Sequence, residues 1–563
     1  MAPSTALFAA FLIFFSFQGQ LPQVQALANR SDHDFSYMKS VKNATDMPSE
    51  EEYDYIVIGG GTAGCPLAAT LSEGHSVLVL ERGGAPETQP NVLSVAGFFA
   101  NLMQEDDGKT PAQRFTSEDG VANVRGRVLG GTGMINAGFY SRADNEFLSK
   151  SGVDWDMDAV EKAYQWVEET IVFHPSSLAV WQSAFKEALV EAGVVPDNGF
   201  RLDHVVGTKV SGSIFDGVGK RHGAVELLNR GNLRNLRVAI HAVVEKIIFS
   251  TVSSSKPSAV GVIYSDANGK FHRALVRDKG EIILSAGAIG SPQLLLLSGV
   301  GSESYLSSLN IPVIHSQPNV GEFMADNPRN NINLVIPFPF ASSPAQVVGI
   351  TSDYIIETVS YSLSFFPIPL PFSLFPTPAS TEVSIATIAE KTTGPLSHGS
   401  LRLSSPNEAK ATPLVRFNYF SDPADLSRCV KGVRKMGDMM NTNSMDRFKY
   451  TGFNGERGFM FLGPALPSNW SDDSSVEDYC RSTVTTFWHY HGGCLVGKVV
   501  DGDFRVMGIN SLRVVDGSTF TISPGTNPQA TLMMLGRYIG LKMLRERREN
   551  LRRFLPVQDS YVL

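Results

Sequence analysis

The sequence has few cysteines and no excess of basic residues. Four cysteines in 563 residues, with no CxxC pair or Cys/His cluster, exclude a disulfide-dense scaffold and give no sign of a structural metal site. Lysine and arginine number 48 against 56 aspartate and glutamate, a net charge of −8, so the chain lacks the basic face of a nucleic acid-binding protein. The one basic run, Arg545–Arg553, alternates with glutamate and is typical of a solvated helix end. We expect neither a nucleic acid partner nor a bound metal.

Clean apolar runs of spanning length are also missing, because a membrane-spanning helix needs about 20 residues. The apolar stretch Ala6–Phe17 is shorter and precedes a small-residue site, Val24-Gln25-Ala26, which is typical of a secretory signal peptide over residues 1–26. Glycosylation sequons, which agree with secretion, begin at Asn29, Asn43 and Asn469. We expect a mature chain without a membrane span in the secretory pathway, destined for the extracellular space or cell wall, or for a vacuole.

The chain has enough apolar material to bury large cores. Apolar residues make up 43% and charged residues 18% of the sequence, which excludes intrinsic disorder. The length predicts two or more domains, or one large interleaved pair. In an oxidising compartment one disulfide can form; Cys429 and Cys480, which flank one expected subdomain, are the candidates. Cys65 lies in a glycine-rich turn and is interpreted as a small buried packing residue.

A strand–helix–strand pattern follows the polar N-terminal region. The apolar strand Tyr55–Ile58 precedes a glycine-rich turn, a helix is expected to about Leu71, and a second strand, Ser76–Leu80, ends at Glu81. Glycine at 59 permits the tight turn, at 61 the approach of backbone to a pyrophosphate, and at 64 close helix–strand packing. Glu81 is placed to accept hydrogen bonds from a ribose diol and disfavours NADP. The unit predicts a dinucleotide site and leaves NAD and FAD both open.

The remaining elements are predicted more coarsely. Residues 27–52 are polar and predict a surface arm, whereas helical periodicity dominates residues 153–192. Pro292 is expected to open a leucine-rich helix. The run Phe365–Phe372 has proline at alternate positions, which excludes a central strand or a helix and leaves an ordered loop over an apolar pocket or a plain core-facing loop. Further strands are expected at Leu236–Ile240, Val243–Phe249, Ala259–Tyr264 and Gly280–Gly287, the last of them buried and ending in small residues.

Five ordered motifs carry a resemblance to a known family. They occupy residues 126–136 (GRVLGGTGMIN), 287–301 (GAIGSPQLLLLSGVG), 488–493 (WHYHGG), 514–518 (VVDGS) and 526–530 (TNPQA). In this order they resemble the signatures of the glucose-methanol-choline (GMC) flavoprotein oxidoreductases, and the resemblance extends from Tyr53 to Arg547. Within that family the chain is most similar to plant (R)-mandelonitrile lyases and their lyase-like relatives, through residues 34–38, 43–46 and 488–493.

The resemblance implies an α/β fold in which a Rossmann-like FAD-binding domain is interleaved with an α+β substrate-binding domain that caps the flavin. Both domains should be discontinuous in sequence, and we expect a monomer. The expected division is an N-terminal arm at 27–52, an FAD-binding domain at 53–160, 225–330 and 488–547, a substrate domain at 161–224 and 331–487, and a C-terminal tail at 548–563.

The resemblance also implies which residues hold FAD, which then supplies the redox chemistry. By this resemblance the glycine-rich turn binds the pyrophosphate, Glu81 binds the adenosine ribose, and the backbone of Val244 contacts the adenine. Close backbone approach to the flavin ring is what Gly-Gly turns permit. The full set of implied cofactor residues is Gly59, Gly61, Thr62, Ala63, Gly64, Glu81, Arg82, Val128, Thr132, Asn136, Val244, Trp488, Asp516, Gly517, Pro528 and Gln529.

By the same resemblance, His489 occupies the position of the family's catalytic histidine. An imidazole, with an ordinary pKa of about 6.5, suits removal of a proton from a substrate hydroxyl near neutral pH. His491 is the rival, since in a strand it would point to the same face. Across the site the mandelonitrile lyases carry a second histidine where this chain has Asn527, and a tyrosine where it has Phe487. A His/Asn pair is the arrangement of several alcohol-oxidising members, in which the amide steadies the developing alkoxide.

Two activities from different classes follow. In the favoured one, His489 deprotonates a small, aromatic alcohol bound against Phe487 and Trp488, and the alcohol carbon delivers hydride to flavin N5. In the alternative, His489 deprotonates a cyanohydrin, the C–C bond breaks to give an aldehyde and HCN, and FAD stays oxidised. A third hypothesis, a pseudoenzyme that keeps FAD for its fold, is disfavoured by the intact pair of His489 and Asn527.

Overall fold

The expected strand–helix–strand unit lies in the middle of an eight-stranded sheet. The computed structural model describes residues 34–250, 256–365, 381–453 and 455–554. In it β2 (Glu50–Ile58) runs parallel to β3 (Val77–Leu80), and α2 (Gly64–Ser72) connects them. This geometry confirms the nucleotide-binding type of α/β fold, because the glycine turn sits between the carboxyl end of β2 and the start of α2.

The sheet around β2 has the strand order β1–β10–β3–β2–β13–β12–β11, with β27 beside β13. Its pairs from β1 to β13 are parallel, and β11, β12 and β13 form an antiparallel edge. The strands expected near 236, 243, 259 and 280 are all present. The remaining bounds are β1 Val41–Asn43, β10 Leu236–Ile240, β13 Phe271–Leu284, β12 Ser258–Ser265, β11 Val243–Ser250 and β27 Leu512–Val514.

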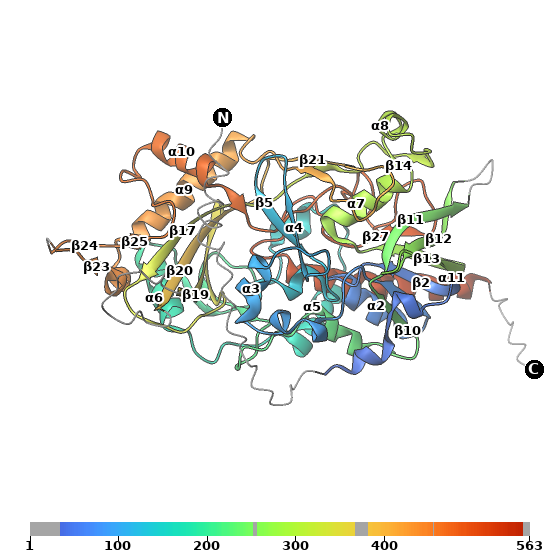
Figure 1. Ribbon diagram of the computed structural model, residues 1–563, viewed down its shortest axis with the longest axis horizontal. Helices are drawn as coiled ribbons and strands as arrows, with labels where there is room; N and C mark the ends of the chain where they lie inside the picture. Colours follow the sequence, from blue (N-terminus) through green and yellow to red (C-terminus); the bar gives the residue numbers. More distant parts are fainter. Residues whose placement is uncertain (1–33, 251–255, 366–380, 454, 555–563) are drawn as a thin grey trace, which may run out of the picture.

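A second eight-stranded sheet forms the other lobe, and Figure 1 shows the two lobes side by side. Its order is β25–β17–β20–β19–β18–β8–β7, with β26 beside β17. Long antiparallel strands dominate it because β17, β19 and β20 are fully paired along their length. The bounds are β25 Met460–Phe461, β17 Pro328–Ile336, β20 Thr381–Thr392, β19 Tyr354–Phe365, β18 Val347–Ile350, β8 Gly207–Val210, β7 Asp197–Phe200 and β26 Thr485–Thr486.

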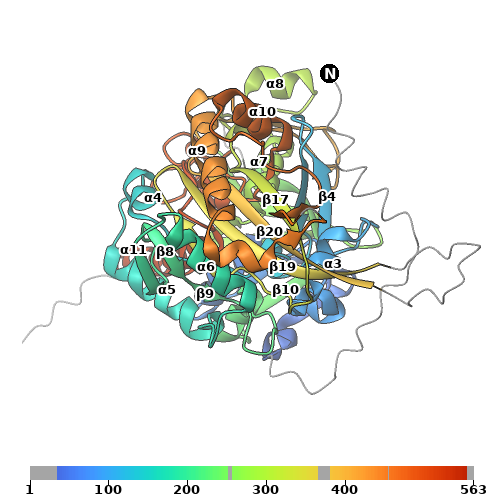
Figure 2. The same ribbon diagram turned by 90° about the vertical axis from the view of Figure 1, so that its left-hand side faces the viewer.

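Helices cover one face of each sheet. In the first lobe the long C-terminal helix α11 packs against α2 and α5, and in the second α6, α9 and α10 pack against the strands (Figure 2). Each lobe has its own apolar core between its sheet and the helices packed on it. The helix bounds are α3 Gly97–Met103, α4 Asn145–Lys150, α5 Met157–Ile171, α6 Val180–Glu191, α7 Gly287–Leu297, α8 Glu303–Ser308, α9 Pro423–Met440, α10 Asp473–Thr483 and α11 Gln529–Phe554.

Short elements complete the fold. The small strand pairs and the three-stranded sheet are β4 Ala112–Thr116 with β5 Ala122–Gly126, β6 Phe139–Tyr140 with β9 Gly212–Ser213, β14 Val300–Gly301 with β15 His315–Ser316, β23 Tyr450–Thr451 with β24 Arg457–Gly458, and β16 Glu322–Met324 with β21 Gly399–Arg402 and β22 Leu414–Arg416. The 3-10 helices are η1 Ser36–Ser40, η2 Ala44–Asp46, η3 Pro86–Thr88, η4 Pro90–Leu93, η5 Gly131–Met134, η6 Ala224–Arg230, η7 Asn443–Phe448 and η8 Gly517–Thr519.

The N-terminal segment expected as a polar surface arm is docked onto the first lobe. Strand β1 pairs in parallel with β10 at the sheet edge, and Tyr37 and Ala44 on either side of it are completely buried. The polar composition concealed this docking, because only a few apolar side chains anchor the segment. The basic run Arg545–Arg553 was interpreted as the end of a helix. It forms the last turns of α11, which extends to Phe554.

One helix begins earlier than expected. Helix α7 starts at Gly287, so Pro292 lies inside it and does not open it. The N–H of Gly287 donates to Oδ2 of Asp516 at 2.9 Å, and this contact holds the start of the helix. Because Asp516 lies more than 200 residues further along the chain, the local pattern around Pro292 could not show it. The expected Pro/Phe loop, beyond its first residue, lies outside the described residues, as do the signal peptide and Asn29.

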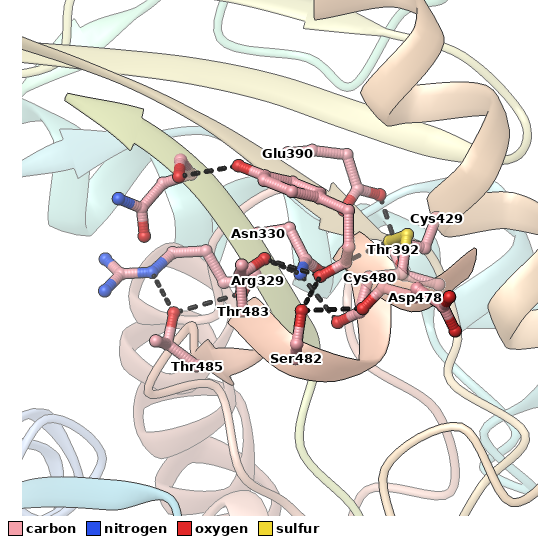
Figure 3. Close-up of a disulfide and its surroundings, with 12 residues drawn as sticks. Arg329, Asn330, Glu390, Thr392, Cys429, Asp478, Cys480, Ser482, Thr483 and Thr485 are labelled. Carbon is pink, nitrogen blue, oxygen red and sulfur yellow. Dashed lines mark hydrogen bonds between the residues drawn. A yellow bond between two sulfur atoms is a disulfide. The ribbon is translucent and has the colours of Figure 1, made fainter. Parts of the chain in front are cut away.

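The predicted disulfide is confirmed. Cys429 on α9 and Cys480 on α10 are bonded, with Cα atoms 6.3 Å apart (Figure 3). The carbonyl oxygen of Cys480 accepts a hydrogen bond from the Asn330 amide at 2.8 Å, which ties this helix pair to β17. Cys65 and Cys494 are free and buried. The described residues contain no helix long and apolar enough to cross a membrane.

We expect removal of this disulfide to destabilise the second lobe. The double variant Cys429→Ala/Cys480→Ala should lose about 4 kcal/mol of unfolding free energy, since the bond closes a loop of 51 residues and restricts the unfolded chain. Denaturant titration measures the loss. Wild-type protein titrated with a reductant should approach the variant, and the variant should not respond to the reductant. Equal midpoints for oxidised wild type and variant would contradict the expectation.

Candidate active site

A cavity of about 1510 Å³ lies between the two lobes and takes its walls from both. The first lobe contributes the glycine turn after β2 and the loop after β27, and the second contributes the strand face of β17, β19 and β20. Of the residues expected at the site, Gly64 and Val128 do not line the cavity. Those that do are Gly59, Gly61, Thr62, Ala63, Glu81, Arg82, Thr132, Asn136, Val244, Phe487, Trp488, His489, Asp516, Gly517, Asn527, Pro528 and Gln529.

The three glycines of the turn have different surroundings. Gly59 has φ +100°, and a Cβ there would lie 2.4 Å from the carbonyl oxygen of Ser285. A Cβ on Gly64 would lie 2.0 Å from the Gly59 carbonyl oxygen, so glycine is required there for packing. Gly61 differs, because a Cβ would meet no protein atom closer than 3.8 Å. The space beside Gly61 therefore belongs to the cavity, as expected where a pyrophosphate approaches the backbone.

Glu81 is held rigidly at the wall of the same cavity. Its Oε2 accepts from the N–H of Gly60 at 3.0 Å and its Oε1 from the N–H of Gly83 at 2.7 Å. Burial raises the pKa of this carboxyl. Each carboxylate oxygen keeps a second lone pair, so Glu81 can still accept a hydrogen bond from a hydroxyl in the cavity. Arg82 also lines the cavity, and its guanidinium donates to the Gly126 carbonyl at 3.0 Å.

Hydrogen bonds join the distant motifs at the cavity. The Asn136 amide donates to Oε1 of Gln529 at 2.8 Å, and Gln529 donates to the carbonyl of Phe139. Asp516 accepts from the backbone N–H groups of Gly287 and Ser518. The motif residues near the expected flavin position therefore brace one another, and the carboxylate of Asp516 serves to fix the backbone of α7 and η8.

His489 and Asn527 face each other in the cavity. The Asn527 amide nitrogen lies 3.4 Å from Nε2 of His489. The His489 backbone N–H donates to Oδ1 of Asp326 at 3.0 Å, and the Phe487 ring lies 4.8 Å from the imidazole, centroid to centroid. Two residues that lie 38 positions apart in the sequence thus form one pair in the cavity.

The rival histidine is engaged elsewhere. The ring Nδ1 of His491 lies 3.0 Å from the carbonyl oxygen of His489, and burial lowers its pKa to about 4. Strand β26 ends at Thr486, before the motif, and Trp488 has φ +59°. The segment is therefore not a strand at the two histidines, so the alternation that would place them on one face does not apply.

Positive charge surrounds the imidazole of His489. Burial lowers the pKa of His489 well below its ordinary value, and the cations of Lys391 and Arg329 add to the effect. Lys391 is completely buried on β20, and its ammonium donates to the carbonyls of Gly525 and Thr526. The Arg329 guanidinium stacks over the Trp488 ring at 4.5 Å. The imidazole is therefore neutral at ordinary pH, the form in which it can accept a proton.

Four charged residues near His489 were not predicted from the sequence. Arg329 on β17, Glu357 on β19 and Lys391 on β20 project from the second sheet, and Asp326 sits just before β17, where burial raises its pKa to about 6. Each lies in a segment without a motif. The alternation of residues along the strands shows which of them share a face of the sheet. It does not show that this face lies near His489.

The sequence and the fold are similar to those of known proteins. GMC oxidoreductase models match residues 53–329 and 395–536. The chain is 56% identical to (R)-mandelonitrile lyase 1 of Prunus serotina over 536 residues, 94% of this chain and 93% of that protein. It is 52% identical to sinalpyl alcohol oxidase Nec3 of Nesocodon mauritianus over 541 residues, 96% and 97% of the two chains. The fold superposes on an Aspergillus oryzae formate oxidase with TM-score 0.73 at 18% identity, covering 90% and 100%.

Fold, cavity and relatives together define a two-lobed flavoprotein whose cofactor is FAD. The residues present fit that cofactor, because Gly61 leaves room for a pyrophosphate and Glu81 stands ready for a ribose diol. The chain belongs to the GMC oxidoreductase family. The resemblance to plant (R)-mandelonitrile lyases and lyase-like proteins expected from the motifs is confirmed.

Proposed function

We propose that the protein oxidises a small aromatic alcohol to the corresponding carbonyl compound, with His489 as the base and Asn527 as the donor to the developing alkoxide. The observation that supports this proposal is the 3.4 Å approach of the Asn527 amide nitrogen to Nε2 of His489 in a cavity shared with the glycine turn. A hydroxyl bound between the two can give its proton to Nε2 and receive a hydrogen bond from the amide.

The electrostatics of the pair suit this reaction. His489 is neutral because burial and neighbouring cations lower its pKa, so its Nε2 lone pair is free to take the hydroxyl proton. The amide of Asn527 then donates to the oxygen as negative charge develops, which stabilises the transition state more than the ground state. Bound FAD supplies the acceptor for the hydride that leaves the alcohol carbon.

The walls of the cavity favour an aromatic substrate. Aromatic side chains from three separate elements line the cavity: Phe98 and Phe99 on α3, Tyr361 on β19, and Phe487 beside Trp488. Such rings offer stacking and edge contacts to an aryl group. A small aromatic alcohol would place its ring against them and its hydroxyl at His489.

The alternative is (R)-mandelonitrile lyase activity, which the 56% identity to a mandelonitrile lyase favours. In that reaction His489 takes the cyanohydrin proton, the C–C bond breaks, and cyanide must be protonated as it leaves. The proton that His489 takes must pass on to cyanide, and an imidazole at position 527 could relay it, whereas an amide cannot. Phe487 likewise lacks the hydroxyl that a tyrosine would offer. Both departures from the lyase pattern favour oxidation.

The variant Asn527→His tests this division of activities. We expect it to raise mandelonitrile cleavage about 10-fold and to lower alcohol oxidation by about 10- to 100-fold, because an imidazole replaces the amide donor. Benzaldehyde release from mandelonitrile and anaerobic flavin bleaching by benzyl alcohol measure the two rates. Phe487→Tyr, alone and combined with Asn527→His, separates the second departure. Higher lyase activity in wild type than in every variant would contradict the proposal.

We also propose that the protein is N-glycosylated and acts as a monomer in the secretory pathway, outside the cell or in a vacuole. Asn469 is exposed, and its side-chain oxygen accepts from the N–H of Ser471 at 3.2 Å. Asn43 is half-buried, and its oxygen accepts from the N–H of Thr45. Asn469 is therefore the more accessible acceptor of the two.

A further inference from the structure

A completely buried lysine lies beside both members of the reacting pair. Lys391 is on β20 and has 0% of its surface exposed. Directly opposite it stand Arg329 on β17 and Ile355 on β19, a second cation and an apolar side chain. Removing an ammonium from water is costly unless hydrogen bonds replace the lost hydration. The hydrogen bonds of Lys391 go to the segment that carries Asn527.

The acceptors of Lys391 are two successive backbone carbonyls. Its ammonium donates to the carbonyl oxygen of Gly525 at 2.8 Å and to that of Thr526. No other hydrogen bond reaches these two carbonyls among the residues that the structure describes. The segment has no regular structure of its own, because it lies between η8, which ends at Thr519, and α11, which begins at Gln529. Lys391 therefore anchors this backbone to the second lobe.

The hydrogen bond to Thr526 acts on Asn527 through the peptide bond. The Thr526 carbonyl group and the N and Cα atoms of Asn527 belong to one planar peptide unit. A cation that holds the carbonyl oxygen therefore sets the direction in which the Asn527 Cα leaves the segment. From that position the Asn527 amide nitrogen comes to 3.4 Å from Nε2 of His489. The amide oxygen has no partner in the described part of the chain, so it does not hold the side chain in place.

The same ammonium faces the segment of the base. Its Nζ lies 5.8 Å from the centroid of the Phe487 ring, a distance at which a cation is attracted to the face of a ring. The Phe487 ring in turn lies 4.8 Å from the imidazole of His489. Arg329, opposite Lys391, stacks over the Trp488 ring at 4.5 Å. Of these two cations, Lys391 contacts both the segment of the base and the segment of the amide donor.

We propose that Lys391 is a positioning residue, whose ammonium holds the Thr526–Asn527 peptide unit and thereby sets the approach of the Asn527 amide to His489 and to the substrate oxygen. Lys391 itself does not line the cavity, so it acts through Asn527. Without the ammonium, two buried carbonyls lose their donor, which is unfavourable, and the segment relaxes to another arrangement. The inference rests on the role of Asn527 under the proposed function.

A double-mutant cycle on the FAD-loaded protein tests this inference. Asn527→Ala should slow flavin bleaching by benzyl alcohol about 100-fold, the effect of one donor to an oxyanion, and Lys391→Met should slow it about 10- to 100-fold. The double variant should be no slower than Asn527→Ala alone, because the effects of residues that act through one another are not additive.

The same cycle can be measured without turnover. Benzaldehyde has a carbonyl oxygen that can accept from the Asn527 amide, and its binding to the oxidised protein is followed by the visible flavin absorbance. Each single variant should bind it about 10-fold more weakly than wild type, the value of one hydrogen bond. The double variant should bind it no more weakly than Asn527→Ala.

Lys209→Met is the matched control. Lys209 is also completely buried in the second sheet, on β8, and its ammonium donates to Ser141 at 2.8 Å and to the carbonyl of Asp203 at 2.7 Å. Both lysine variants lose a buried cation, so both should lower the melting temperature, but Lys209→Met should keep the wild-type bleaching rate and benzaldehyde affinity. If Lys391→Met does not fold, Lys391→Gln, which keeps an N–H donor, enters the same cycle.

Full additivity of Lys391→Met and Asn527→Ala would overturn the inference, since the ammonium would then act on His489 directly or on folding alone. Wild-type rate and affinity in Lys391→Met, equal losses in Lys209→Met, or no benzaldehyde binding to wild type would also overturn it. Failure of the proposed function is seen separately, because benzyl alcohol would then not bleach the wild-type flavin, while the benzaldehyde cycle would still show whether Lys391 acts through Asn527.

Discussion

Replacing His489 by alanine is expected to slow flavin bleaching by an alcohol by about 10²- to 10⁴-fold, the usual contribution of a general base, with FAD still bound. Nε2 of His489 faces the Asn527 amide at 3.4 Å, and burial with neighbouring cations keeps the imidazole neutral. The rival His491 is engaged elsewhere, because its Nδ1 lies 3.0 Å from the His489 carbonyl oxygen. Anaerobic rapid mixing with benzyl alcohol measures the rate directly.

Two other histidine variants show whether the loss is specific to His489. His491→Ala should cost much less than His489→Ala, since His491 acts on the backbone turn and not on the substrate proton. His398→Ala, at an exposed histidine whose ring lies 5.1 Å from the Phe323 ring, should behave as wild type. Equal losses of rate in His489→Ala and His491→Ala would contradict the assignment of His489 as the base. An unchanged rate in His489→Ala would show that His489 has no part in the reaction.

The glycine turn is expected to separate cofactor binding from folding. Gly61→Val should weaken FAD binding by about 10- to 100-fold, because the added side chain enters the space beside the turn and blocks backbone N–H bonds to phosphate, each worth about 1.5–3 kcal/mol. A Cβ at Gly61 meets no protein atom within 3.8 Å, so the apoprotein should fold normally. FAD content by visible absorbance and melting temperature by circular dichroism measure the two properties.

Gly64→Val is the matched control. Its Cβ would lie 2.0 Å from the Gly59 carbonyl oxygen, so this variant should lose folded protein as well as cofactor. The contrast between neighbouring glycines identifies which of them faces the ligand. A Gly61→Val protein that retains full FAD content, or one that fails to fold, would contradict the placement of the pyrophosphate beside Gly61.

The strength of the sequence prediction varied with the range of the interactions involved. The strand–helix–strand unit was predicted correctly, because glycine spacing and local periodicity report local structure. The disulfide between Cys429 and Cys480 was also predicted correctly, from the expected oxidising compartment and from the two cysteines flanking one expected subdomain. The start of α7 was predicted wrongly, since Asp516 fixes it from more than 200 residues away. The docking of residues 36–46 was missed for a similar reason, as a parallel pairing with β10 leaves no local pattern.

The site shows the same limit. His489 and Asn527 were predicted through family motifs, and the structure brings them together at 3.4 Å. Glu357 and Lys391 were not predicted, because a charged residue in a strand ordinarily marks the solvent face. Here that face of the second sheet covers the cavity between the lobes, so burial and not exposure sets the chemistry of these charges.

Anaerobic mixing of the FAD-loaded protein with benzyl alcohol, and separately with mandelonitrile, tests the central claim most directly. The proposed oxidation predicts that the alcohol bleaches the visible flavin absorbance within one turnover and that benzaldehyde appears in equal amount. Release of benzaldehyde and cyanide from mandelonitrile while the flavin stays oxidised, with no bleaching by any alcohol of an aromatic and aliphatic panel, would contradict it and make the protein a lyase.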